Sequence, residues 1–152
     1  MRLTELILPE TVVTGVAASS RDELLASIVH DLNGKGLIAD PDATTRDLVA
    51  RETVMSTGVG NGVAIPHAYT DGVTRLMAGL FRTREPIAFG APDDLAVDLF
   101  FVVLGPRDSR RDHIRILARI SRLISHSDFR DDLRRAENAD GVTAVLRRFG
   151  ER

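Results

Sequence analysis

The amino-acid sequence predicts an α/β fold with a mixed central β-sheet flanked by helices, in a three-layer arrangement. Strand-like apolar runs dominate the first two thirds of the chain, and amphipathic helical segments dominate the last third. One helical segment directly follows the first strand. This order indicates a mixed sheet covered by helices, because a regular parallel sheet would alternate strands and helices throughout. A length of 152 residues is typical of one core, so we expect a single domain over residues 1–152.

The N-terminal third is expected to form one strand and two helices. The β-branched run Thr11–Val16 favours a strand. Ser20 and Glu23 have the spacing of a capping box, which opens a helix that ends at Gly34. The apolar stripe of this helix consists of Leu24, Leu25, Ile28, Val29 and Leu32. A second helix is expected over residues 42–53.

The middle of the chain combines an irregular segment with strands. Residues 56–62 (STGVGNG) are expected to be irregular, because three glycines and an asparagine break any period. The short apolar runs 63–65 and 76–81 favour strands. The run 97–104 (VDLFFVVL) is almost continuously apolar, which predicts a strand that is buried on both faces.

The last third is expected to be helical. Ser109 and Asp112 again have capping-box spacing, and a helix follows to about Ile124. The inward stripe of this helix consists of His113, Ile116, Leu117, Ile120, Leu123 and Ile124. Two shorter helices are expected over residues 129–135 and 141–149.

The composition excludes several classes of protein. The sequence contains no cysteine, which rules out a disulfide framework, thiolate metal sites and cysteine nucleophiles. The net charge of −2 gives no general attraction to nucleic acid or to anionic membranes. No segment approaches the roughly 20 apolar residues of a membrane span, and residues 1–8 lack the features of a secretory signal. We therefore expect a cytoplasmic protein that neither binds nucleic acid nor inserts into a membrane.

His67 is the first candidate for chemistry. Pro66 biases the residue before it toward an extended conformation, and the apolar run 63–65 would anchor this backbone in the core. His67 is therefore expected where a strand ends, on a rigid support beside a loop. An imidazole in such a place can act as a nucleophile, an acid or base, or a metal ligand. The alternative is a histidine that finishes a strand and bonds a nearby carbonyl.

The glycine-rich segment before His67 is a candidate for binding an oxyanion, because glycines let backbone N–H groups approach closely. Its candidate phosphate-binding residues are Ser56, Thr57, Gly58 and Gly60. The segment is not a Walker loop, because no Gly-Lys-Ser/Thr follows it. It is not a dinucleotide fingerprint either, because it lies after a helix and before a strand. The alternative is a tight turn that requires positive φ.

Three further side chains are candidates near this segment. Arg51 lies at the end of the helix expected over residues 42–53 and has a planar fork that suits a phosphoryl group, although a solvated arginine is the alternative. The simplest role of Glu52 is an ion pair with a neighbouring arginine. His113 lies in a first helical turn, whose field favours a nearby anion and a neutral imidazole. Such an imidazole can donate one N–H to a phosphoryl oxygen, or it can simply pack in the core. Two histidines without a third ligand make a poor metal site.

A longer pattern surrounds His67, and it consists of Glu52, Val59-Gly60, Val63-Ala-Ile-Pro-His67 and Ala68. This pattern resembles the signature of the IIA domains of the fructose, mannitol and nitrogen-regulatory type in the bacterial phosphoenolpyruvate-dependent phosphotransferase system. The likeness extends over residues 3–149. It includes the segment 56–62, Pro86–Phe89, Val97–Leu99, and His113 with Leu117-Ala118 after it.

The resemblance implies the fold of the mannitol-specific IIA type and the activity of a phosphoryl carrier. His67 would be the phosphorylated nucleophile, Arg51 and His113 would hold the phosphoryl group, and Ala68 would complete the phosphate-binding residues. The donor would be an HPr-like phosphocarrier protein. No cofactor and no metal are implied, because the phosphoryl group arrives already activated on nitrogen.

Two roles within this family differ in what receives the phosphoryl group. A nitrogen-regulatory IIA controls a transporter, a kinase or another target through its phosphorylation state, whereas a fructose-type IIA donates to a IIB component for sugar uptake. The cysteine that such a IIB uses would have to lie on a separate protein. The solitary domain and the segment 56–62 favour the regulatory role. A non-phosphorylated regulatory binding module is the alternative of another class. Tyr69 stands where the family often has a polar or basic residue, which bears on partner choice.

Overall fold

The computed structural model describes residues 2–150, so residues 1 and 151–152 of the expected domain lie outside it. The strands are β1 (Ile7–Val16), β2 (Gly58–Gly60), β3 (Val63–Ala64), β4 (His67–Tyr69), β5 (Met77–Ile87) and β6 (Val97–Gly105). The helices are α1 (Leu3–Leu6), α2 (Arg21–Gly34), α3 (Pro41–Val54), the short 3-10 helix η1 (Arg107–Ser109), α4 (Arg110–Ile124), α5 (Ser127–Arg135) and α6 (Ala139–Gly150). Within the described part of the chain, no helix has both the length and the apolar character needed to cross a membrane.

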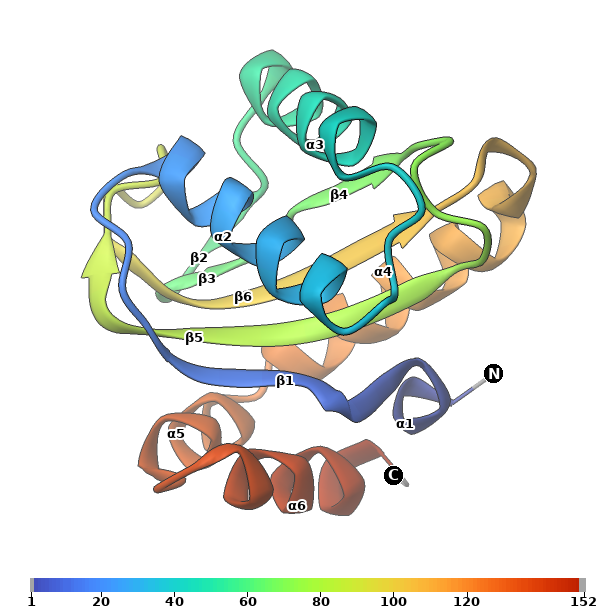
Figure 1. Ribbon diagram of the computed structural model, residues 1–152. Helices are drawn as coiled ribbons and strands as arrows, with labels where there is room; N and C mark the ends of the chain where they lie inside the picture. The colour runs from blue at the N-terminus through green and yellow to red at the C-terminus, as the bar shows by residue number, and fades with distance from the viewer. Residues whose placement is uncertain (1, 151–152) are drawn as a thin grey trace.

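The strands form one mixed sheet with helices on both faces, as the sequence predicts. The strand order is β1-β5-β6-β3-β2, and β4 also pairs with β6. Helices α2 and α3 cover one face, and α4, α5 and α6 cover the other (Figure 1). The antiparallel pair β5–β6 is flanked by parallel pairs of β1 with β5 and of β3 and β4 with β6. The three-layer α/β prediction is therefore confirmed.

Strand β6 lies at the centre of this sheet and contributes to both hydrophobic cores. Leu99, Phe101 and Val103 pack in the core beneath α4, α5 and α6. Phe100, Val102 and Leu104 pack in the core beneath α2 and α3. Because successive side chains of a strand point to opposite faces, a strand between two helical layers needs apolar residues at nearly every position. The predicted burial of this strand on both faces is confirmed.

Local signals place the first helices correctly. The Ser20 hydroxyl accepts a hydrogen bond from the Glu23 amide at 3.2 Å and caps α2. Asp40 caps α3 by accepting from the Ala43 amide at 3.1 Å. The predicted helices over residues 129–135 and 141–149 are also present, as α5 and α6.

Two strands are longer than their apolar runs, because pairing with neighbouring strands satisfies their backbone. β1 begins at Ile7, which pairs with Ala78 of β5. β5 continues beyond Phe81, and Arg82 pairs with Leu99 of β6. The Arg82 guanidinium donates to the backbone carbonyls of Leu133, in the last turn of α5, and of Ala136 just after it, so its polar side chain is accommodated there.

Two local predictions are wrong. Ser109 does not cap α4, because it ends the 3-10 helix η1 with φ −92° and ψ 13°, away from the extended conformation of an N-cap. Its hydroxyl donates instead to the Pro106 carbonyl at 2.6 Å. The segment 56–62 is not wholly irregular either, because Gly58–Gly60 forms β2 and pairs antiparallel with β3. That pairing partner supplies the order that local sequence preferences do not predict.

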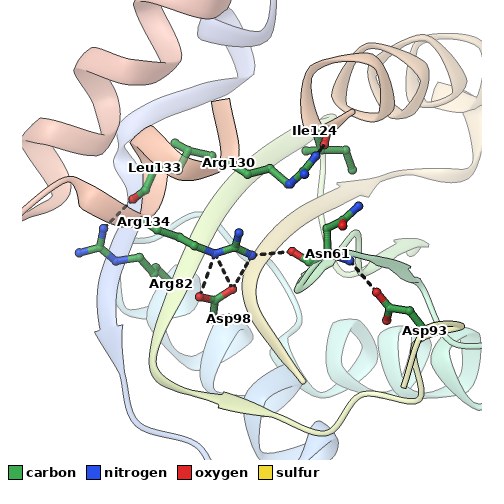
Figure 2. A network of polar contacts seen from close by, with 8 residues as sticks. All are labelled: Asn61, Arg82, Asp93, Asp98, Ile124, Arg130, Leu133 and Arg134. Atoms are coloured by element: carbon green, nitrogen blue, oxygen red, sulfur yellow. Dashed lines mark hydrogen bonds and ion pairs between the residues drawn. The ribbon is translucent and has the colours of Figure 1, made fainter. Parts of the chain in front are cut away.

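The turn between β2 and β3 is held by a network of polar contacts (Figure 2). Gly60, Asn61 and Gly62 all have positive φ, which makes a tight reversal possible. Arg134 of α5 donates to the Asn61 carbonyl at 2.6 Å and forms a bidentate ion pair with Asp98 of β6. Asp93 accepts from the Asn61 amide at 2.8 Å. The network therefore fixes the far end of the β2–β3 hairpin to both β6 and α5.

Candidate functional site

His67 is the first residue of β4, in parallel register with Val103 of β6. The sequence prediction placed it at a strand end beside a loop, so its position within a paired strand is a correction. The Val103 amide donates to the Pro66 carbonyl at 3.0 Å, which begins the β4–β6 pairing one residue before His67. The side chain is half-buried. The predicted rigid support is therefore the central strand of the sheet itself.

The hydrogen bond of the His67 ring determines its tautomer. Nδ1 lies 2.7 Å from the Ile65 carbonyl oxygen. Because a carbonyl only accepts, Nδ1 carries the hydrogen and the lone pair of the neutral ring lies on Nε2. Burial lowers the pKa of His67, and the positive charge of Arg51 lowers it further, against the hydrogen bond to Ile65. The ring is therefore held neutral, with Nε2 available as a nucleophile.

His113 is the fourth residue of α4 and faces the sheet, as its place on the apolar stripe predicts. Its side chain is 0% exposed, and its ring centroid lies 5.8 Å from that of His67 in an edge-on arrangement. Neither ring nitrogen has a hydrogen-bond partner among the described residues. Burial and the neighbouring His67 lower the pKa of His113 to about 4, so the ring is neutral at physiological pH.

Two residues lie beside His113 that the sequence reasoning did not connect with it: Tyr69 was related only to partner choice, and Gly105 was not singled out. The ring centroid of Tyr69, also on β4, lies 4.3 Å from that of His113. Gly105 pairs with Tyr69, and a Cβ at Gly105 would collide with Ser109 Oγ and approach His113 Nδ1 to 3.4 Å. The signal available in the sequence was the glycine that ends an otherwise apolar strand. Gly105 permits α4 to begin close to the end of β6.

Arg51 approaches His67 from the opposite helical layer. It lies in the last turn of α3, is half-buried, and donates from Nη1 to the Met55 carbonyl at 2.8 Å. The positive charge of Arg51 lowers the pKa of His67 and so disfavours its imidazolium form. The structure therefore brings together Arg51, His67 and His113, which are far apart in the sequence and belong to three different elements.

Glu52 differs from its expected role. It is 3% exposed, and its carboxylate accepts hydrogen bonds from the Thr57 amide at 2.5 Å and the Thr57 hydroxyl at 2.7 Å rather than pairing with an arginine. Burial raises the pKa of Glu52, against these hydrogen bonds, which lower it. The Thr57 carbonyl in turn accepts from the Ile65 amide at 3.0 Å. A chain of hydrogen bonds thus runs from Glu52 through Thr57 and Ile65 to His67.

The residues of segment 56–62 that are predicted to bind phosphate either donate their amides within the chain or lie beside an acidic side chain. The amides of Thr57 and Gly58 donate within the chain, to Glu52 and to the Ser56 hydroxyl. A Cβ at Gly60 would lie 3.2 Å from Asp93 Oδ2, and an acidic neighbour disfavours an anion there. Phosphate binding by Ser56, Thr57, Gly58 and Gly60 stays a prediction. The role that the contacts support directly is to position the backbone that carries His67.

Ala68 has a different position from the other predicted phosphate-binding residues. It is buried in the core beneath α2 and α3, whereas the side chains of its neighbours His67 and Tyr69 contact His113 of α4 on the opposite face. A small residue at position 68 is therefore accounted for by packing. Phosphate binding at Ala68 also stays a prediction.

The assembled groups suit transfer of an anionic group to nitrogen. His67 supplies a lone pair, Arg51 supplies a fixed positive charge, and His113 supplies a neutral N–H donor. Within residues 2–150, no cluster of three or more acidic or histidine side chains is placed to hold a metal ion.

Comparison with known proteins identifies relatives over nearly the whole chain. The model of the family described as phosphoenolpyruvate-dependent sugar phosphotransferase system, EIIA 2, matches residues 5–149. The fructose-specific EIIA component from Haloferax volcanii is 40% identical over 111 residues, which cover 73% of this chain and 72% of that protein. A nitrogen regulatory protein from Pseudomonas aeruginosa is 31% identical over 146 residues, which cover 96% of this chain and 95% of that protein.

Solved structures show the same fold. The nitrogen regulatory protein IIA-Ntr from Neisseria meningitidis superimposes with a TM-score of 0.83 at 29% identity, covering 95% of this chain and 98% of that chain. The mannitol IIA enzyme in complex with phosphorylated IIB from Escherichia coli gives a TM-score of 0.76 at 19% identity, covering 91% and 94%. The second likeness concerns the fold alone, and it confirms the predicted mannitol-IIA-like architecture.

Proposed function

Because the chain belongs to the EIIA 2 family of the phosphoenolpyruvate-dependent sugar phosphotransferase system, we propose that it is a phosphotransferase acting through a phosphohistidine at His67. It accepts a phosphoryl group from a phosphohistidine carrier protein of the HPr type. It then passes the group on, or uses it to regulate a target protein. The relay takes place in the cytoplasm.

The observation that carries this proposal is the hydrogen bond between His67 Nδ1 and the Ile65 carbonyl. It fixes the tautomer in which the lone pair of Nε2 is free, so the phosphoryl group is attached at Nε2. A histidine that merely finished a strand could make the same hydrogen bond, but it would have no need of an arginine whose positive charge acts on the ring, as that of Arg51 does on His67. The retained group of Arg51, His67 and His113 also argues against a non-phosphorylated binding module.

The transfer step needs no metal or cofactor, because one N–P bond replaces another. The lone pair of His67 Nε2 attacks phosphorus in line with the bond to the donor's imidazole nitrogen. As the new N–P bond forms, the donor's N–P bond breaks and its electron pair stays on the donor nitrogen. Arg51 neutralises charge on the equatorial oxygens, and His113 donates an N–H to one of them. The reverse geometry passes the group to the next acceptor.

The regulatory role is supported over the sugar-transport role by the segment 56–62 and by the likeness to the nitrogen regulatory protein IIA-Ntr, at 29% identity and a TM-score of 0.83. The sequence relatives include both roles, because a nitrogen regulatory protein is 31% identical over 96% of this chain and a fructose-specific component is 40% identical over 73% of it. A regulatory IIA would bind a transporter or a kinase according to its phosphorylation state. A sugar-specific IIA would instead donate to a separate IIB component, as the complex of mannitol IIA with phosphorylated IIB illustrates for that protein.

The decisive experiment is phosphorylation by the general donor proteins, followed by intact-mass analysis at alkaline pH. We expect one phosphoryl adduct on the wild-type chain, lost on acidification, and none on His67→Ala. His126→Ala is the matched control, because His126 is an exposed histidine, and it should be phosphorylated normally. An adduct that persists in His67→Ala would refute the assignment of the acceptor.

The acceptor nitrogen can be tested separately by ³¹P–¹⁵N correlation spectra of the phosphorylated chain. Phosphorus should couple to Nε2 of His67. Coupling to Nδ1 would contradict the tautomer argument while leaving the acceptor residue intact.

A further inference from the structure

We propose that Tyr69 is a positioning residue that holds the ring of His113 in place for its interaction with the phosphoryl group on His67. This inference rests on the proposed function and deepens it. It concerns a residue outside the group of Arg51, His67 and His113 that was identified from the sequence.

The geometry places His113 between two side chains of one strand. His67 and Tyr69 are separated by one residue of β4, so both side chains point to the same face. The ring of His113 lies 5.8 Å from that of His67, at an interplanar angle of 63°. It lies only 4.3 Å from that of Tyr69, at an interplanar angle of 38°. Tyr69 is therefore the closer of the two ring neighbours.

Packing has to orient His113, because hydrogen bonds do not. Within residues 2–150, neither Nδ1 nor Nε2 of this fully buried ring has a hydrogen-bond partner. Histidines with a defined role are usually oriented by a hydrogen bond from the second ring nitrogen. Here the tilted contact with Tyr69, at a ring-centroid distance of 4.3 Å, supplies that orientation. Gly105, which pairs with Tyr69, lets Nδ1 of His113 approach the end of β6.

An orienting contact has a chemical consequence for the adduct. Pre-positioned donors stabilise charge without reorganising at the moment of reaction. A freely rotating imidazole would donate to the phosphoryl oxygens for only part of the time. Loss of the Tyr69 ring should therefore shorten the lifetime of the phosphoryl adduct, although Tyr69 itself need not touch the phosphoryl group.

Two substitutions separate orientation from packing volume. Tyr69→Phe keeps the aromatic ring, and Tyr69→Leu keeps an apolar side chain but removes the ring. We expect the adduct of Tyr69→Leu to hydrolyse about 2- to 10-fold faster than that of the wild type. This range corresponds to the typical contribution of one aromatic contact. Tyr69→Phe should restore the wild-type lifetime. Thermal unfolding of each variant controls for a general loss of structure.

A double-mutant cycle tests whether the effect passes through His113. In the background of His113→Ala, Tyr69→Leu should shorten the adduct lifetime no further. An undiminished effect in that background would overturn the proposal. A wild-type adduct lifetime in Tyr69→Leu would also overturn the proposal. If only the KM for the donor protein rises in this variant, Tyr69 is a contact for the partner protein and does not position His113.

A measurement without phosphorylation keeps this inference separate from the proposed function. Nuclear Overhauser contacts between the ring protons of His67 and His113 should be present in the wild type and in Tyr69→Phe, and weakened in Tyr69→Leu. If the wild-type chain accepts no phosphoryl group, the proposed function fails, yet these ring contacts still test the role of Tyr69. Unchanged contacts in Tyr69→Leu would refute it.

Discussion

The two ends of strand β6 carry polar clusters of opposite character. At its start, Asp98 accepts a bidentate ion pair from Arg134, which also binds the Asn61 carbonyl, so the charges are matched and the lone pairs are used (Figure 2). Near its end, β6 supports His67 and faces His113, whose buried ring nitrogens have no partner within residues 2–150. The same strand thus carries one cluster whose charged groups are paired, called the saturated end below, and one cluster with unpaired groups.

This contrast distinguishes polar residues that hold the fold together from polar residues that serve a function. A buried polar group without a partner costs free energy, of the order of 1–3 kcal/mol, and folding alone gives no reason to keep it. A saturated network, by comparison, can be explained entirely by the elements it holds together. We therefore expect substitutions at the histidine end to change chemistry more than stability, and substitutions at the Asp98 end to do the reverse.

The largest effect should come from Arg51→Ala at the histidine end. Removing a charged donor from a transferring phosphoryl group should slow phosphoryl transfer by about 10²- to 10³-fold. Arg51→Lys should recover part of the rate, because lysine keeps the charge but loses the planar fork. The rate of adduct formation, followed by intact mass after rapid mixing, measures both. Arg46→Ala, at an exposed position of the same helix, is the matched control and should transfer normally.

The next effect concerns acid stability through His113. Its pKa falls from the ordinary 6.5 to about 4 in the folded chain, mainly through burial. Between these pH values the unfolded chain binds the additional proton, so the free energy of unfolding decreases as pH falls. Protonation of His113 in the unfolded chain lowers the free energy of unfolding by a total of about 3 kcal/mol once the pH is below about 4.

The variant His113→Leu tests this contribution. It should lose that part of the pH dependence and be at least as stable as wild type at pH 7, because two unpartnered nitrogens are removed. Urea unfolding at pH 7 and at pH 4.5 measures the difference for both chains. An identical acid dependence of wild type and variant would show that His113 is not held neutral by the fold.

The smallest of these effects is expected at the saturated end. Asp98→Ala leaves Arg134, whose side chain is 30% exposed, without its carboxylate, and should lower the free energy of unfolding by about 2 kcal/mol. Adduct formation on His67 should stay within twofold of wild type. Asp132→Ala removes the more exposed ion pair with Arg148 and should cost less than about 1 kcal/mol. A marked loss of phosphoryl transfer in Asp98→Ala would abolish the distinction between the two ends.

Much of the fold could be predicted because its signals are local. The Ser20 cap and the apolar stripes of α2 and α4 each reflect contacts within a few residues. The errors occur where strand pairing or a neighbouring element overrides the local preference of the residues. β2 forms because β3 pairs with it, and Ser109 fails as a cap because η1 precedes α4.

The mixed three-layer fold and the candidates His67, Arg51 and His113 could be predicted from the sequence, because periodicity, caps and the signature around His67 lie within short stretches of the chain. The tautomer of His67, the hydrogen bonds of Glu52 with Thr57 and the contact of Tyr69 with His113 depend on tertiary packing. Tyr69 and His113 stand on different elements, 44 positions apart in the sequence. Such contacts exist only after β4 has paired with β6 and α4 has packed on the face of the sheet to which Tyr69 points, and no local pattern encodes them.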